Sequence, residues 1–173
     1  MPRIILSTLN AKYAHCSLAL RCLYANMGDL QEDTEIQEYI WSERACDLAE
    51  KILETQPEIL GLGVYIWNAV ETLSLVRILK SVAPSLVIVL GGPEVSHEYE
   101  EQELTELADY TVIGEGDLAF AEICREILFE KTRPEEKFIK GGEPKLAELV
   151  SPYSYYTDKD IKERSIYVEA SRG

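Results

Sequence analysis

The chain has 173 residues, a formal net charge of −14 at pH 7 and 46% hydrophobic residues, which is typical of one globular domain with a sizeable core. The negative charge repels phosphate backbones and excludes direct nucleic-acid binding by this chain, and no apolar run approaches the roughly 18 residues of a membrane span. The four cysteines show no CxxC spacing, which argues against a metal site and is typical of thiols in a reducing compartment, so we expect a cytoplasmic protein.

Apolar, β-branched runs alternate with amphipathic stretches from the N-terminus onward. The pattern predicts strands at residues 3–8, 35–40, 59–65, 86–90 and 110–113. It predicts helices near residues 17–27, 43–55, 69–83, 98–107 and 118–129. Three of the strands are continuously apolar, as parallel strands covered by helices on both faces must be. Five βα units therefore predict a doubly wound α/β domain with a five-stranded parallel sheet over residues 1–130.

The pattern changes after residue 129, where turn residues, charges and short apolar pieces follow one another without a helical period. We interpret residues 131–173 as a connector that leaves the core domain. Within it, KFIKG forms a candidate short edge strand. SIYVEASRG alternates like a strand and ends in a glycine turn, so we expect it to begin a further domain. Without that domain, the segment after about Ser151 is expected to be extended or poorly ordered.

The fourth predicted strand stops at VIVLGGPEV, residues 87–95. In an open parallel sheet, ligands bind beyond the carboxyl ends of the strands. Gly91 and Gly92 leave room there for a ligand because they carry no Cβ, and Pro93 fixes the exit of the chain. A tight βα turn without a ligand explains the same residues equally well.

Three familiar sites are absent from the sequence. No GxGxxG motif follows the first strand and no GxxxxGK[ST] motif occurs, which excludes the usual dinucleotide and P-loop sites. A phosphorylation receiver needs clustered acids after the first strand, where this chain has Ser7, Thr8 and Asn10. No pair of side chains suggests a nucleophile with its base, so we expect no catalytic residues in this chain.

The order of the βα units and the segments GGPEVS, TVIGEGD and YVEASRG resemble the N-terminal part of cobalamin-binding radical S-adenosylmethionine (radical SAM) proteins. In that family, the ASRG-type turn leads directly into a CxxxCxxC loop. LSTLNAKYAHCSLALRCL, with SPYSY and YVEASRG, is similar to an uncharacterised subgroup. The resemblance implies a flavodoxin-like cobalamin domain that precedes a catalytic barrel in the same chain, and we expect the natural protein to continue with the first cysteine of that loop.

The resemblance also implies the cofactors and the function. Cobalamin would bind this domain weakly in isolation, and S-adenosylmethionine and a 4Fe-4S cluster would bind the following barrel. The parent protein would be a methyltransferase or another radical enzyme acting on a substrate that the sequence does not identify. The alternative is a degenerate domain that serves only as a scaffold or docking module for the barrel.

The implied site residues come from four segments. The glycine pair would admit the nucleotide tail of cobalamin, and the other segments would line the corrin or the tail. The residues are Asn10, Tyr13, His15 and Ser17; Tyr65, Trp67 and Asn68; Gly91, Gly92, Pro93 and Glu94; and Gly114, Glu115 and Gly116. Backbone N–H groups at helix starts would hold the tail phosphate without a basic side chain.

Several of these residues have two interpretations. The DxHxxG motif of histidine-ligated cobalamin domains is absent: His15 lies in the corresponding region, but Tyr13 replaces the acid that would orient its imidazole. His15 is therefore either a cobalt ligand or a helix-start histidine bonded to backbone or solvent. Trp67 either packs on the corrin or covers the core. Asn68 is expected to cap the next helix through its side-chain oxygen, and Glu115 to favour the positive end of a helix dipole.

Overall fold

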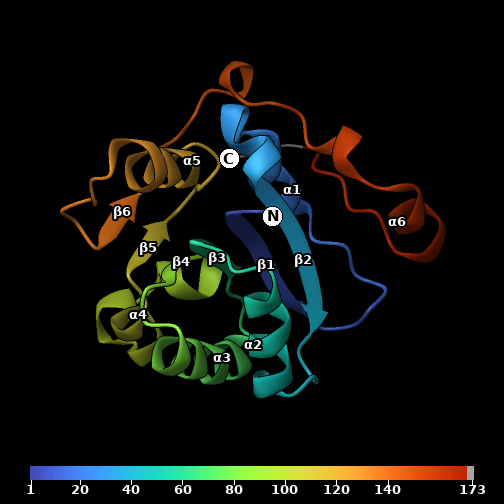
Figure 1. Cartoon of the computed structure of the whole chain (residues 1–173). Coiled ribbons are helices and arrows are strands. Elements are labelled where there is room, and N and C mark those ends of the chain that lie inside the picture. The colour runs from blue at the N-terminus through green and yellow to red at the C-terminus, as the bar shows by residue number, and fades with distance from the viewer. Residues whose placement is uncertain (171–173) are drawn as a thin grey trace.

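The computed structural model describes residues 1–170, which form a parallel sheet with helices on both faces (Figure 1). The strand order is β2-β1-β3-β4-β5-β6, with β1 Ile4–Asn10, β2 Thr34–Ile40, β3 Ile59–Gly63, β4 Val87–Gly91, β5 Tyr110–Ile113 and β6 Phe138–Lys140. The doubly wound α/β fold is confirmed, but the sheet has six strands and not five. The additional strand β6 is the KFIKG segment, which pairs in parallel with β5.

Six α-helices accompany the sheet over the described residues: α1 Leu18–Ala25, α2 Ala45–Glu54, α3 Ala69–Val82, α4 Glu103–Leu107, α5 Ala119–Arg125 and α6 Asp158–Glu163. In Figure 1, α1 and α5 lie above the sheet and α2, α3 and α4 below it. The helix predicted at 98–107 is a 3₁₀ turn followed by the short α4. None of the helices over residues 1–170 has the length and apolar character needed to cross a membrane.

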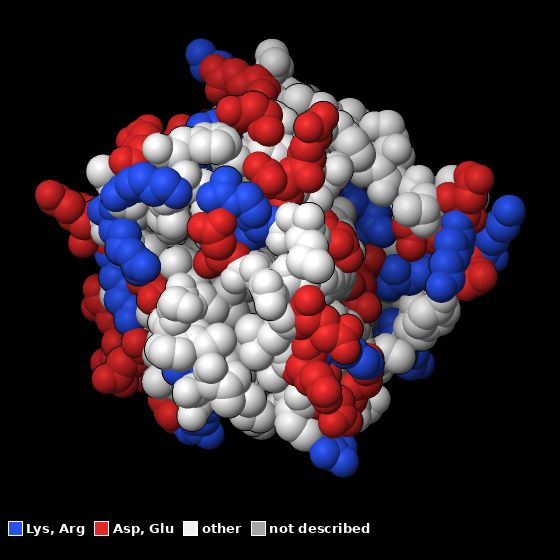
Figure 2. All heavy atoms as spheres, viewed as in Figure 1, with Lys and Arg blue, Asp and Glu red and all other residues white. Residues whose placement is uncertain are grey.

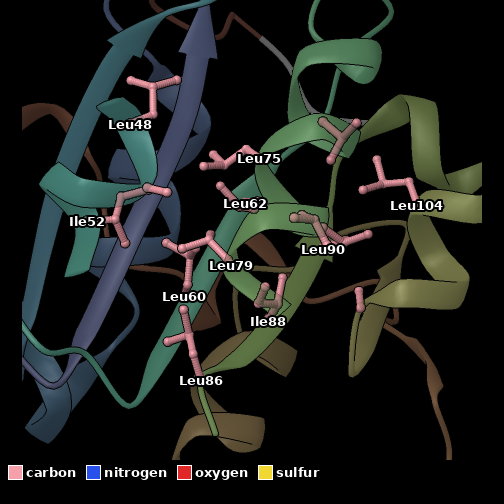
Figure 3. Close-up of a cluster of buried hydrophobic side chains, with 14 of the residues drawn as sticks. Leu48, Ile52, Leu60, Leu62, Leu75, Leu79, Leu86, Ile88, Leu90 and Leu104 are labelled. Carbon is pink, nitrogen blue, oxygen red and sulfur yellow. The ribbon is translucent and has the colours of Figure 1, made fainter. Parts of the chain in front are cut away.

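The sheet is covered on both faces because successive side chains of each strand point to opposite sides. Toward α2, α3 and α4, buried leucines and isoleucines from the sheet and the helices form one core cluster (Figure 3). Toward α1 and α5, a second cluster includes Ile4, Leu6, Val89, Phe120 and Ile123. These two clusters hold the central strands as a rigid platform between helical layers.

The order of the strands places β1 between β2 and β3, so the chain leaves β1 toward one edge of the sheet and β3 toward the other. Such a switch of direction opens a crevice at the carboxyl ends of the two strands. The loops after β1 and β3 line this crevice. The fold therefore predicts a ligand site at this edge.

The segment after β6 does not run away from the domain. It crosses the outer side of α1, from the β6 edge toward the β2 edge, and forms α6 there (Figure 1). Thr157 caps α6 in a reciprocal capping box with Asp160, whose side chain is buried. The expectation of an extended or poorly ordered segment after Ser151 is therefore wrong, because α6 packs against the domain through polar contacts that have no apolar period.

The predicted strand SIYVEASRG is not a strand in its described part. Ser165 makes a single parallel bridge with His15, and residues 166–169 belong to neither a helix nor a strand. The remaining residues 171–173, where the glycine turn was expected, lie outside the described residues.

Charged side chains are distributed over the surface. On the face shown in Figure 2, acidic side chains stand in several groups with lysines and arginines between them, and a continuous uncharged area lies in the lower half. The net charge of −14 is therefore spread over the surface and does not form one patch on this face.

Candidate functional site

A cavity of about 610 Å³ lies between the sheet and helix α1, at the carboxyl ends of β3 and β4. We call it the sheet cavity. Its floor is formed by Gly61, Gly63 and Gly91, and its walls include Leu23 of α1 and Phe120 of α5. It continues the α1/α5 core toward the carboxyl ends of the strands, where β3 and β4 contribute three glycines to its lining.

The strand register explains this hollow. Thr8 pairs with Gly63 and Gly63 pairs with Gly91, so three small residues stand side by side on three neighbouring strands. Lower in the same strands and on the same face, Ile59 and Val87 fill the core. The change from large to small residues along β3 and β4 therefore creates the cavity.

Gly91 and Gly92 differ in what they require. A Cβ added to Gly91 would meet no atom within 4 Å, so the protein itself leaves that space open. Gly92 has φ +110°, and its Cβ would lie 2.5 Å from the carbonyl oxygen of Val64. The fold therefore needs glycine at position 92 with or without a ligand, whereas the glycine at position 91 serves only the cavity.

Ser96 joins the turns after β4 and β5. Its hydroxyl donates to the Gly92 carbonyl at 2.9 Å and accepts from the Gly114 N–H at 3.3 Å. Gly114, with φ +83°, and Gly116 line the sheet cavity. The sequence pattern predicted the two glycines but not the serine that links their turns.

A second cavity of about 460 Å³ adjoins the first, and the two share Leu18, Ala19 and Tyr65 in their linings. We call it the edge cavity. Tyr65 lines both cavities and stacks on Trp67, with ring centroids 4.5 Å apart and planes 7° apart. Trp67 is 48% exposed, so its ring forms a wall of the edge cavity and does not cover the core. The stacked pair offers a flat apolar surface beside the switch point.

The loop after β1 forms the opposite side of the edge cavity. Asn10 donates to the His15 carbonyl at 3.1 Å and to Glu38 at 3.0 Å, and Ser17 caps α1 by accepting from the Leu20 N–H. These contacts hold the loop in one shape. Tyr13 points away from the cavity and donates to Glu163 at 2.8 Å.

His15 has a partner that the sequence did not indicate. Its Nδ1 is hydrogen-bonded to the hydroxyl of Tyr167, and the two rings are stacked with centroids 5.9 Å apart. The partner is 152 residues away in the chain, so no local motif could have predicted it. The imidazole is therefore held by a tyrosine side chain and not by backbone or solvent alone.

Asn68 is fully buried, and its side chain does not cap helix α3. Its oxygen accepts from the Tyr65 N–H at 2.8 Å, and its amide group donates to the Leu9 carbonyl at 3.0 Å. The capping prediction is therefore wrong. Asn68 instead ties the end of β1 to the backbone of the segment after β3, at Tyr65.

The structure brings most of the predicted site residues together. The sheet cavity is lined by Tyr65, Gly91, Gly92, Pro93, Gly114 and Gly116. The edge cavity is lined by Asn10, His15, Ser17, Tyr65 and Trp67. The linings of both cavities leave out Tyr13, Asn68, Glu94 and Glu115. Helix α5 begins at Ala119, so Glu115 precedes its first turn and does not support the dipole role expected for it.

Gly61 and Gly63 are functional candidates that the sequence reasoning missed. The segment GLG places glycine at alternate positions of one strand, and alternation puts both on one face. That signal was present in the sequence, but its meaning depends on the register with Gly91.

The two cavities share Tyr65 and are lined mostly by apolar side chains and glycines, which suits a mostly apolar ligand that extends from one into the other. The described residues that line the two cavities include no lysine or arginine, so an anionic group of the ligand would depend on backbone N–H groups.

Comparisons with known proteins identify a family and several relatives. Residues 6–124 match the B12 binding domain family. Over 86 residues the chain is 33% identical to 2-(S-pantetheinyl)-carbapenam-3-carboxylate methyltransferase of Streptantibioticus cattleyicolor. Over 81 residues it is 28% identical to the cobalamin-dependent radical SAM methyltransferase TokK of Streptomyces tokunonensis. Each match spans 44% of this chain but only 11% of the relative.

Two solved structures share the fold. A cobalamin-binding protein from Desulfitobacterium hafniense DCB-2 superposes with a TM-score of 0.54 and 21% identity, over 72% of this chain and 58% of the other. The radical S-adenosylmethionine methyltransferase TsrM from Kitasatospora setae, with cobalamin and a [4Fe-4S] cluster bound, gives a TM-score of 0.54 and 20% identity, over 78% of this chain and 26% of the other. Since the matched residues 6–124 run from β1 into α5 and include the glycine floor of the sheet cavity, the chain belongs to the B12 binding domain family.

Proposed function

We propose that this chain binds cobalamin for a radical SAM methyltransferase. The observation that carries the proposal is the row of Thr8, Gly63 and Gly91, which opens an apolar cavity at the carboxyl edge in a member of the B12 binding domain family. The flat base of the nucleotide tail fits this cavity, because no Cβ stands on the floor. The corrin would lie across the edge cavity, next to Trp67 and His15.

The chain's own residues have three tasks in this function. The glycine floor and Phe120 receive the tail, and Ser96 holds the two turns at the cavity mouth. Asn68 fixes the backbone at Tyr65, whose ring stacks on Trp67 and lines both cavities. The apolar walls exclude water from the base.

The link to methyl transfer is supported by the relatives. Both curated relatives are methyltransferases, and one is named as cobalamin-dependent and radical SAM. Bound cobalamin would supply a cobalt centre that carries a methyl group. S-adenosylmethionine and the 4Fe-4S cluster would be held by another domain, so this chain binds and orients a cofactor and is not an enzyme by itself.

Equilibrium dialysis against hydroxocobalamin tests the proposal and detects weak binding as well as tight binding. We expect the natural chain to bind, and the series Gly91→Ala, Gly91→Val and Gly91→Leu to bind progressively less as the added side chain fills the sheet cavity. Thermal stability should stay near that of the natural chain, because a Cβ at position 91 meets open space.

Ser81→Leu is the matched control, since it adds the same side chain at an exposed position of α3 on the other side of the sheet. Equal binding by Gly91→Leu and by the control would overturn the assignment of the tail to the sheet cavity. A natural chain that binds no hydroxocobalamin would favour the scaffold or docking function instead.

A further inference from the structure

Four buried charged side chains join the C-terminal segment to the sheet. Arg21 of α1 donates to Glu38 of β2 at 3.1 Å and to Asp160 of α6 at 2.9 Å. Arg164 donates to Glu38 at 2.8 Å and to Asp160 at 3.2 Å. Their side chains are between 4% and 11% exposed, and we call the four residues the ion network.

The ion network is balanced, with two cations and two anions in mutual contact. Burial opposes ionisation of the carboxyls, yet hydrogen bonds and the arginine charges hold the pKa of Glu38 and of Asp160 below their ordinary values. The ligand atoms of Cys16, Glu38 and Asp160 lie within 4.8 Å of one another. The two guanidinium groups already supply positive charge there, so the cluster is built as an ion-pair network and not as a metal site.

The ion network fixes the residues that follow it. Arg164 also donates from Nε to the Tyr13 carbonyl at 3.0 Å, and the Ser165 N–H donates to the Ala14 carbonyl at 2.7 Å. The chain then passes the carboxyl edge, where Tyr167 meets His15 and accepts at its carbonyl from the Tyr156 hydroxyl at 2.9 Å. We call residues 153–170 the strap.

The strap forms part of both cavity walls. Tyr167 and Val168 line the edge cavity, and Glu169 lines the sheet cavity. The Glu169 N–H donates to the Tyr153 hydroxyl at 2.9 Å, which closes the strap on itself. The strap lies beyond residues 6–124, so the match to the B12 binding domain family does not account for it.

We propose that the strap is the outer wall of the cobalamin site and that the ion network positions it. Tyr167 and Glu169 would contact the ligand, while Asp160 and Arg164 are positioning residues that act through them. This inference rests on the proposed function. It adds ligand-contacting residues from a segment outside the family match and predicts that the charges of Asp160 and Arg164 control how long cobalamin stays bound.

Two measurements on the full chain test the inference. Hydrogen exchange of the strap amides, recorded without ligand, reports whether the strap is anchored. The second measurement is the dissociation rate of bound hydroxocobalamin after dilution into an excess of ligand-free buffer. This rate reports whether the strap retains the ligand. The variants are Asp160→Asn, which removes one charge without changing shape, and Tyr167→Phe, which removes the hydroxyl that is hydrogen-bonded to His15 but keeps the stacked ring.

For Asp160→Asn we expect strap amides to exchange at least about tenfold faster and release to accelerate by a similar factor, since loss of one partner leaves buried arginine charge uncompensated. Amides of β1 and β3 should keep their protection. For Tyr167→Phe we expect unchanged strap exchange and faster release. Glu103→Gln, which breaks the exposed pair with Arg77, is the control and should change neither rate.

The outcomes separate the two proposals. Faster strap exchange with unchanged or slower release would show that the strap is not a wall of the site. Unchanged strap exchange in Asp160→Asn would show that the ion network does not anchor it. A natural chain that binds no hydroxocobalamin would overturn the proposed function and the ligand contacts of the strap together, whereas the exchange data would then still decide the anchoring.

Discussion

At the scale of single residues, Gly91 and Gly92 at the end of β4 are expected to respond differently to substitution. Gly92→Ala is expected to lower the free energy of unfolding by at least about 1 kcal/mol, because alanine strains at φ +110° and its Cβ would approach the Val64 carbonyl to 2.5 Å. Gly91→Ala should change stability by less than about 0.5 kcal/mol, since the new Cβ meets open space. Urea unfolding of both variants measures the difference, and equal losses would contradict the assignment of position 92 to the fold.

The sequence predicted the positions of Gly91, Gly114 and Trp67 at the carboxyl edge, because each follows a strand that its apolar run identifies. It did not predict which way a side chain points once the strand has ended. Glu94 and Glu115 stand beside lining residues but outside both linings, and Asn68 turns back to Leu9 where a cap was expected. The backbone geometry of the turns decides these orientations, and the sequence pattern does not reveal that geometry.

At the scale of elements, continuous apolar runs made the central strands predictable to within a few residues. The three-residue β6 was predicted only as a candidate edge strand outside the five-stranded sheet, since a strand this short shows too little alternation to be identified by pattern. Helix α6 was missed because its sequence DKDIKE has no apolar face; a capping box and ion pairs stabilise it instead. The threonine three residues before Asp160 was the one available signal.

The docking of α6 is expected to depend on pH. The pKa values of Glu38 and Asp160 are lowered in the folded protein, so their stabilisation is fully present above the ordinary carboxyl pKa of about 4 and is lost as the pH falls through the lowered values. Arg21 and Arg164 stay charged throughout. Burial raises the pKa of the neighbouring Cys16 thiol to about 12, so this thiol adds no charge at neutral pH.

Urea unfolding of the natural chain and of Asp160→Asn at several pH values measures this dependence. The variant should be less stable by about 3 kcal/mol at pH 7, as is typical when a buried ion pair loses one partner, and the difference should shrink steadily below pH 4. A difference that stays constant down to pH 2 would show that Asp160 acts through packing and not through its charge.

At the scale of the whole molecule, the residues after position 130 belong to the packed structure. A chain that ends at Glu130 is expected to lose β6 and the strap, to leave the β5 edge unpaired and to expose the outer side of α1. The midpoint temperature of thermal unfolding should therefore be lower than that of the full chain. This decrease should be larger than the decrease caused by Asp160→Asn. If both variants unfold at the same temperature, β6 contributes little to stability.

The ion network also has a consequence for the order of assembly. Glu38 and Arg164 are 126 residues apart, so a growing chain can make this contact only after all strands of the sheet have been synthesised. At a synthesis rate of about 5–20 residues per second, the interval between the synthesis of Glu38 and that of Arg164 is about 6 to 25 s. During that interval the sheet and both cavities can form while the side of the site covered by the strap is still open. If the proposed function holds, cobalamin can bind a chain that is still being synthesised before the strap covers the site. Once the strap has formed, it slows the dissociation of cobalamin.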